Sequence, residues 1–209
     1  MADLPTPRPA AALRDTSVDA VARQLFTQAR THGHWLPRAV APALLRELYE
    51  LARCGPTSMN TQPMRLKFVI SDAAKQRLVA CVNPGNVAKT QAAPVVVIVG
   101  QDLSFPEHLP RLFAHKTDAR SYYEDKPEFT ATTALRNSSL QGGYLILAAR
   151  LLGLDCGPMS GFDPAAVDRA FWAGSTVRTN FLCNLGYGDA SQLKPRPPRL
   201  DFDEACEIV

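Results

Sequence analysis

Apolar side chains recur at helical spacing in three main stretches of the chain. Thr16 or Ser17 can cap a first helix, predicted to reach Arg30, in which apolar residues repeat every three or four positions. A second helix is predicted over residues 42–54. The strongest pattern covers residues 137–154, where apolar side chains occur on almost all sides, and a helix of this kind is buried.

Shorter apolar runs between these helices have the pattern of β-strands. Residues 66–70 alternate as a strand should, and residues 95–99 form a continuous β-branched run suited to a strand buried on both faces. Residues 178–186 give a further strand. A short helix, capped by Ser71 and ending near Val79, follows the first of these strands.

Composition indicates one domain in a reducing compartment. The chain has 209 residues, of which 46% are apolar, and a net charge of +3, which requires no polyanionic partner. Residues 1–15 are predicted to be disordered and residues 16–209 to form the single domain. There is no apolar signal core and no membrane-spanning run, so a cytoplasmic location is expected. The cysteines are odd in number and widely spaced, which favours neither a disulfide framework nor a zinc site.

The polar loop, residues 53–63, connects the second helix to the first strand and is unusually rich in hydrogen-bonding side chains. Gly55 permits a left-handed helix exit, and Pro56 and Pro63 stiffen the path. Its neutral donors and acceptors are Thr57, Ser58, Asn60 and Gln62. Such a surface suits a flat polar heterocycle, although a proline-braced turn with local hydrogen bonds has the same composition.

Two further clusters could bind a ligand. Arg30, Thr31 and His32 combine positive charge with a hydroxyl and could hold a phosphate, or could simply end a helix favourably. His32 and His34 have no acidic or thiol neighbour, so a metal site is not expected. Residues 83–86 have the composition of a turn, and Lys89 follows Asn86 on the same face of a helical turn, which could equally be plain surface.

Glycines mark two segments in the C-terminal third of the chain. Residues 157–162 are expected to form a loop whose glycines let its amide groups approach a planar ligand. Residues 186–188 resemble a nucleotide-binding turn, but the prolines of residues 194–199 forbid the helix that this motif requires. The basic, proline-rich segment 194–199 could instead be a peptide ligand of SH3 type or a solvated tail.

The polar loop resembles a known family signature. Pro56, Thr57, Ser58, Asn60, Gln62 and Pro63 fit the pattern Pro-(Ser/Thr)-Ser-x-Asn-x-Gln-Pro of the FMN-dependent nitroreductase family. With residues 157–162 and 184–188, the resemblance points to the branch that includes malonic semialdehyde reductase of pyrimidine degradation. It implies an α+β fold with a mainly antiparallel sheet flanked by helices, and an intertwined homodimer with FMN at the subunit interface.

The resemblance also implies roles for individual residues. Arg30, Thr31 and His32 would hold the flavin phosphate and ribityl chain, together with Lys194 and Arg196. Asn86 and Lys89 would lie against the pyrimidine edge, where the Lys89 ammonium would stabilise the charge of the reduced flavin. The amide groups presented to flavin N5 and O4 would come from the segment Gly157, Pro158, Met159, Ser160 and Gly161.

In this family residues 101–130, the cover segment, correspond to a mobile cover over the flavin. Its candidates for substrate contact are His115, Arg120 and Tyr123, which spacing alone cannot separate. The apolar helix with Gly142 and Gly143 is expected at the dimer core, and residues 201–209 are expected to pack on the partner subunit.

Three functions are compatible with these features. The branch resemblance implies reduction of malonic semialdehyde to 3-hydroxypropanoate with NADH or NADPH, the hydride passing through FMN and no side chain acting as nucleophile. A broad nitroaromatic or quinone reductase is the first alternative. A non-catalytic interaction protein that uses the proline-rich tail is the second, and it predicts a colourless protein.

Overall fold

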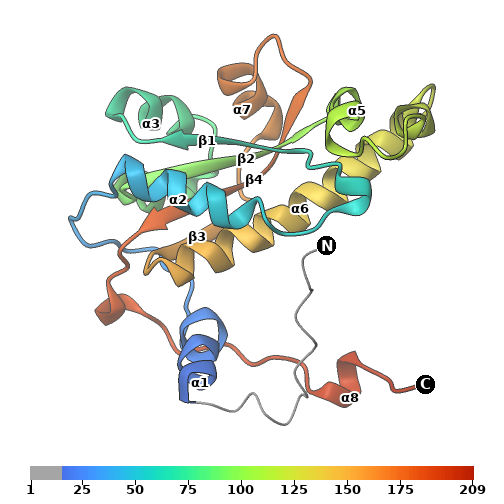
Figure 1. Ribbon diagram of the computed structural model, residues 1–209. Coiled ribbons are helices and arrows are strands. Elements are labelled where there is room, and N and C mark those ends of the chain that lie inside the picture. Colours follow the sequence, from blue (N-terminus) through green and yellow to red (C-terminus); the bar gives the residue numbers. More distant parts are fainter. Residues whose placement is uncertain (1–15) are drawn as a thin grey trace.

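The computed structural model describes residues 16–209, so the predicted disorder of residues 1–15 lies outside the described part. A four-stranded sheet has the order β1-β2-β4-β3, and every neighbouring pair is antiparallel. Its strands are β1 (Met64–Val69), β2 (Val95–Asp102), β3 (Asp155–Met159) and β4 (Val177–Gly186). Helices flank the sheet (Figure 1), which confirms the predicted α+β class.

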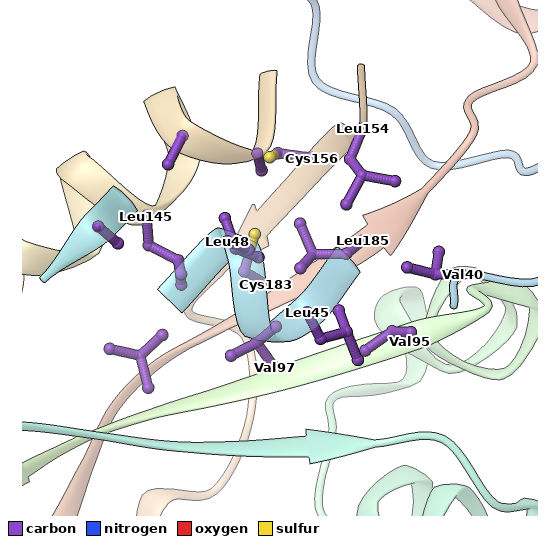
Figure 2. Packing of buried hydrophobic residues seen from close by; sticks show 14 of the residues in the cluster. Val40, Leu45, Leu48, Val95, Val97, Leu145, Leu154, Cys156, Cys183 and Leu185 are labelled. Atoms are coloured by element: carbon purple, nitrogen blue, oxygen red, sulfur yellow. The ribbon is translucent and has the colours of Figure 1, made fainter. Parts of the chain in front are cut away.

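The central strand β2 is buried on both faces, as its β-branched run predicts. Val95, Val97 and Val99 face α2 (Pro42–Ala52) and α6 (Pro127–Leu151), and these residues form one core cluster. Figure 2 shows side chains of this cluster converging from the two helices and the sheet. This layer contains the largest of the described core clusters.

The opposite face of the sheet carries the second core cluster. Val96 and Ile98 point to this side because successive side chains of a strand alternate between faces. They pack with residues of α3 (Asp72–Val79), α7 (Pro164–Phe171) and the segments around α4 (Pro84–Ala92). The sheet therefore lies between two helical layers.

Local sequence explains where these helices begin. The Ser71 side chain accepts a hydrogen bond from the Ala74 amide, and Asp163 caps α7 in the same way through the Ala166 amide. Proline follows as the first residue of α2, α4 and α7, a position where its missing N–H costs nothing. The cap predicted at Ser71 is confirmed.

Three predicted elements need correction. The first helix ends early: α1 (Thr16–Ala22) continues as the π-helical η2 (Arg23–Thr27), before Arg30. The predicted turn at residues 83–86 instead begins α4, because Pro84 favours a first helical turn. Part of the predicted loop at residues 157–162 belongs to β3, where the cross-strand ladder to β4 overrides its Gly-Pro composition.

The long helix also differs from its prediction. It begins at Pro127 rather than near residue 137, and its buried face there includes polar residues such as Thr133 and Asn137. Leu140 and Leu151 are 44% and 47% exposed in the single chain, so the helix is not buried all round. Gly142 packs against the Phe181 ring, whereas a Cβ on Gly143 would meet open space.

The cover segment is folded rather than extended. It contains η4 (Phe105–His108), α5 (Leu109–Leu112) and η5 (Ala119–Tyr123). With Ala134 of α6, its apolar side chains form a small separate core: Phe105, Leu109, Ala119 and Tyr123, with Met59, Leu103 and Phe113 packed against them. The polar loop contributes Met59 to this core, so the loop and the cover are in direct contact.

The C-terminal segment leaves the body of the fold. After η6 (Ala190–Gln192) the chain runs away from the sheet and carries the short helix α8 (Phe202–Ala205) (Figure 1). Its apolar residues are among the most exposed in the described chain: Leu200, Phe202, Ile208 and Val209. Within residues 16–209, no helix combines the length and apolar character needed to cross a membrane.

Candidate functional site

A basic pocket of about 900 Å³ lies where the two ends of the described chain meet. It is lined by parts of residues 26–34 and 189–199, and it contains five cationic side chains: Arg30, Arg150, Lys194, Arg196 and Arg199. None of these five forms a salt bridge within residues 16–209. Asp189 is the one carboxylate among the described lining residues; the Ser191 hydroxyl and amide donate to it and lower its pKa.

Reciprocal hydrogen bonds join the two segments of this pocket. The Arg30 guanidinium donates to the Lys194 carbonyl, and Arg196 donates to the carbonyls of Thr27 (3.0 Å) and Ala29 (2.6 Å). The early end of η2 leaves these two carbonyls without a helical partner. A guanidinium has five N–H donors, so both arginines keep donors for a bound anion.

His32 lines the pocket but is largely buried in its wall. It is 6% exposed, its Nε2 lies 3.5 Å from Asp155 Oδ1, and the other oxygen of that carboxylate accepts from the Gly188 amide at 2.9 Å. A Cβ on Gly188 would approach the His32 ring to 2.0 Å. Sequence analysis singled out Gly188 only as part of residues 186–188 and did not indicate Asp155; the structure places both against the His32 imidazole.

The same segment is fixed to β3 at its backbone. The His32 amide donates to the Cys156 carbonyl at 3.0 Å, beside a bridge between Thr31 and Cys156. A Cβ on Gly157 would lie 2.5 Å from the His32 carbonyl oxygen, so glycine is needed for this approach. In the rest of the predicted segment, Pro158 and Ser160 are exposed and Met159 is buried.

Asn86 and Lys89 reach the same end of the sheet. Asn86 Nδ2 donates to the Gly161 carbonyl at 2.7 Å, which joins α4 to the end of β3. The aliphatic stem of Lys89 lies 3.9 Å from the position of a Cβ on Gly33, a residue that lines the basic pocket. Lys89 forms no salt bridge with any carboxylate of residues 16–209, so its charge is available to a ligand.

The polar loop is a strained segment with an internal hydrogen-bond network. Met59, Asn60 and Gln62 have φ values of 49°, 51° and 40°, a region that non-glycine residues rarely adopt. Gln62 Nε2 donates to Asn60 Oδ1 at 2.6 Å, and the Gln62 amide donates to Thr57 Oγ1 at 3.2 Å. The loop is braced by its own side chains, as the interpretation of a proline-braced turn with local hydrogen bonds predicts, and its binding of a planar ligand stays a prediction.

Contacts from outside hold the polar loop against its neighbours. The Ser58 amide donates to Asn137 Oδ1 on α6 at 2.8 Å, and Tyr144 Oη donates to the Pro56 carbonyl at 3.1 Å. Asn60 Nδ2 donates to the Leu112 carbonyl of the cover at 2.8 Å. Asn60 therefore uses both ends of its amide within the chain.

The segments that line the basic pocket lie at the opposite end of the sheet from the polar loop (Figure 1). The loop leads into β1 at Met64, which pairs with Gln101 near the end of β2. The pocket lies beside Cys156, whose partner Leu185 pairs with Val95 at the start of β2. One chain thus assembles Arg30, Thr31, His32, Asn86, Lys89, Lys194 and Arg196, but separates them from Pro56, Thr57, Ser58, Asn60 and Gln62.

The three cover candidates have different environments. Arg120 pairs with Glu107 at 2.9 Å, and His115 packs on the Phe113 ring with centroids 4.0 Å apart. Tyr123 is 7% exposed and its hydroxyl faces the Met59 sulfur at 3.9 Å. Burial raises the pKa of the Tyr123 phenol. Of the three, Arg120 and His115 remain exposed, and Tyr123 belongs to the small core of the cover.

A second cavity of about 770 Å³ borders the free edge of β1, and the sequence had not indicated it. Its positively charged lining residues are Arg53, Arg65 and Arg111, and His108 lies beside them. Charge clustering could not have revealed them because they are far apart in the chain. Among residues 16–209 there is no group of three potential metal ligands, and all five cysteines are free thiols.

Comparison with known proteins decides the family. The model of the nitroreductase family matches residues 26–187. The chain belongs to the nitroreductase family. The match includes the polar loop, α4, β3 and β4, whereas Lys194 and Arg196 lie beyond its end.

Close relatives support this assignment. A protein of Stutzerimonas stutzeri (strain A1501), provisionally named NADH dehydrogenase/NAD(P)H nitroreductase, is 59% identical over 185 residues, covering 88% of this chain and 94% of the relative. A protein of Burkholderia lata with the same kind of name is 58% identical over 193 residues, covering 92% and 98%.

Solved structures share the nitroreductase fold at low identity. A provisionally described nitroreductase of Bacillus subtilis has a TM-score of 0.84 at 22% identity, covering 91% of this chain and all of the other. A protein from Exiguobacterium sibiricum 255-15, described as a nitroreductase in complex with FMN, has a TM-score of 0.82 at 18% identity, covering 89% and 96%. At these identities the likeness concerns the fold alone.

Proposed function

We propose that this chain is an FMN-dependent oxidoreductase that uses NADH or NADPH. The observation that carries the proposal is the basic pocket, where unpaired cations from both chain ends surround a space suited to a phosphate. Relatives named as NAD(P)H nitroreductases and a neighbouring structure in complex with FMN support the same cofactors. Mild denaturation of the purified protein should release a yellow chromophore with the phosphate content of FMN. A colourless protein that takes up no FMN would contradict the proposal.

In this proposal each part of the chain has a separate task. Arg30, Lys194 and Arg196 bind the phosphate, and Thr31 lies beside them as a hydroxyl donor. FMN, when bound, supplies the hydride chemistry between the nicotinamide and the substrate. Lys89, whose stem lies beside Gly33 of the pocket, supplies a positive charge to the flavin. Asn86 holds the end of β3 in place through its hydrogen bond to the Gly161 carbonyl.

A homodimer completes the site in this proposal. Because the polar loop lies at the other end of the sheet from the basic pocket, the loop of a second copy would supply the remaining contacts. The exposed tail, residues 200–209, would pack on that copy, and its carboxylates complement the cationic second cavity beside β1. Truncation after Pro198 should then weaken the dimer, as measured by light scattering.

Mixing two defective variants tests the shared site directly. Lys194→Met/Arg196→Met lacks phosphate anchors, and Asn60→Ala/Gln62→Ala lacks the polar loop amides. If each site uses two chains, about half of the randomly mixed dimers contain one copy of each variant. In such a dimer one site combines the intact pocket with the intact loop and the other site combines the two defects. Activity should therefore return to about a quarter of the wild-type value. Each variant alone should be nearly inactive. Activity that stays at the level of the separate variants after mixing would contradict a site built from two chains.

For the substrate, we propose malonic semialdehyde, reduced to 3-hydroxypropanoate. The motif resemblance supports this, and Arg120 or His115 on the exposed side of the cover could face the carboxylate. A broad nitroaromatic or quinone reductase is the second candidate, favoured by the names of the relatives. Steady-state rates across aldehydes, quinones and nitroaromatics with both nicotinamides separate the two. Preference for the semialdehyde by less than about tenfold, or 1.4 kcal/mol, would favour the second candidate.

A non-catalytic interaction protein is disfavoured by the position of the tail. Arg196 donates to the carbonyls of Thr27 and Ala29, so the proline-rich segment lies against its own chain instead of being free for an SH3-type partner.

A further inference from the structure

The polar loop holds three of the four non-glycine residues with positive φ in the described chain. Met59, Asn60 and Gln62 adopt this conformation only because their surroundings enforce it. At the entry of the loop, Asn137 supplies an acceptor for the Ser58 amide. The exit of the loop, at Gln62 and Pro63, is held by residues of β1 and β2.

The exit is fixed by Asp102, the last residue of β2. Its amide donates to the Pro63 carbonyl at 2.8 Å, and its side chain, 9% exposed, pairs with Arg65 Nη2 at 2.6 Å. The second carboxylate oxygen accepts from Thr176 Oγ1 at 2.8 Å and from the Ser104 amide at 2.9 Å. These bonds leave the carboxylate little freedom, so Arg65 has a rigid partner.

Arg65 carries this constraint back to the loop. While Nη2 is bound by Asp102, Nη1 donates to the carbonyls of Gln62 (3.1 Å) and Met64 (3.0 Å). The Gln62 carbonyl belongs to a residue with φ of 40°, whose side chain in turn positions Asn60. The planar guanidinium bridges a buried anion and two carbonyls at once, which an ammonium cannot do.

We infer that Arg65 and Asp102 are positioning residues that hold the polar loop in its flavin-binding conformation. The inference rests on the proposed function, because it assigns the loop to FMN. Arg65 and Asp102 touch neither the basic pocket nor its cations. Loss of Arg65 removes the donor to the Gln62 carbonyl, and loss of the Asp102 charge frees the guanidinium that carries this donor, so the strained residues relax towards ordinary φ values.

Titration of apoprotein with FMN tests this inference. Arg65→Met and Asp102→Asn should each weaken FMN binding about tenfold, or about 1.4 kcal/mol. The FMN affinity of the double variant should also fall about tenfold, and not about a hundredfold, because both residues act through the same Arg65–Asp102 ion pair. Arg65→Lys, which keeps the charge and one donor contact, should recover part of the affinity. At saturating FMN, the turnover number of each variant should change less than its affinity does.

Arg178→Met is the matched control. Arg178 on β4 lies 3.9 Å from Asp168 of α7 in a looser and more exposed ion pair, so its loss should change the unfolding temperature little and leave FMN affinity unchanged. Equal affinity losses in Arg178→Met and Arg65→Met would reduce Arg65 to a general stabilising role. If Arg65→Met does not fold, Asp102→Asn and Arg65→Lys decide the matter; unchanged affinity in both would overturn the inference. Wild-type protein that binds no FMN would instead overturn the proposed function.

Discussion

The basic pocket and the polar loop differ in how their polar side chains are paired. The pocket gathers five cations from distant parts of the chain and leaves them without carboxylate partners within residues 16–209. The loop gathers neutral amides and hydroxyls from one short segment and pairs them with one another. The pocket therefore offers charge on a backbone of ordinary conformation, whereas the loop offers a fixed shape on a strained one.

This difference shows where each region can tolerate change. Unpaired cations near the surface repel one another modestly and are stabilised by an anion, so their removal should harm binding more than folding. The loop side chains stabilise their own backbone through hydrogen bonds, so their removal should weaken both FMN binding and folding. A variant that alters FMN affinity with stability unchanged is thus expected at the pocket and not at the loop.

The largest effect is expected for Arg196→Met. Loss of a charge-assisted phosphate contact and of the bonds to Thr27 and Ala29 should weaken FMN binding about a hundredfold, or about 2.7 kcal/mol. Fluorescence titration of apoprotein measures this. The control is Arg199→Met in the same pocket, whose guanidinium, among residues 16–209, donates only to the carbonyls of Pro197 and Pro198. Equal losses in the two variants would mean that total charge, and not the placed guanidinium, holds the phosphate.

Lys89 extends the comparison from binding to redox chemistry. Its aliphatic stem lies beside Gly33 of the pocket, and its ammonium forms no salt bridge in residues 16–209, so Lys89→Met should remove charge while keeping much of the stem. The reduction potential of bound FMN should fall by roughly 30 to 60 mV, equivalent to about 1.4 to 2.8 kcal/mol for two electrons. Dye-coupled reduction at fixed pH and salt measures it. An unchanged potential in a variant that keeps its flavin would return Lys89 to the plain surface.

Gly157→Ala probes the backbone packing beneath the pocket. A Cβ there would lie 2.5 Å from the His32 carbonyl, a backbone atom that cannot rotate away, so destabilisation of about 1–3 kcal/mol is expected. Gly85→Ala is the matched control in α4, where a Cβ meets open space and the better helix propensity of alanine should stabilise by about 0.5–1 kcal/mol. Urea unfolding of both variants gives the two values. Destabilisation of the same size in both would show that close approach at Gly157 is unimportant.

The sequence predicted most of what depends on local pattern. The buried β-branched strand, the capped helices α3 and α7 and the composition of the polar loop all follow from side chains close together in the chain. The predicted first helix is longer than the observed one, which ends at Thr27 with η2. At that point the Thr27 carbonyl accepts a hydrogen bond from Arg196, a residue far along the chain. Periodicity contains no information on such a partner.

The residues that sequence analysis missed share one property. Arg65 and Asp102 support the polar loop, while Asp155 supports His32; each acts through a neighbour brought close by the sheet register. The separation of the loop from the pocket also depends on register, since it is set by which ends of β1 and β3 meet β2 and β4. Motif spacing predicted which residues belong together but not which ends of the sheet they occupy.

The smallest effect is expected on the loop side, at Tyr123. Burial raises the pKa of this phenol in the folded protein above the value of about 10 expected in the unfolded chain. Its contribution to stability is therefore fully present below about pH 10 and is lost as pH rises through the folded-state pKa.

Tyr123→Phe keeps the ring contacts with Phe105 and Phe129 and gives up the weak hydroxyl contact with Met59. The variant should thus be slightly less stable than wild type at neutral pH, by under about 1 kcal/mol, and this gap should narrow in alkaline solution. Urea midpoints measured between about pH 7 and pH 11 at constant ionic strength test the difference. Parallel curves for the two proteins would show that the Tyr123 hydroxyl is accessible to water, and the cover would then be open where it contacts Met59.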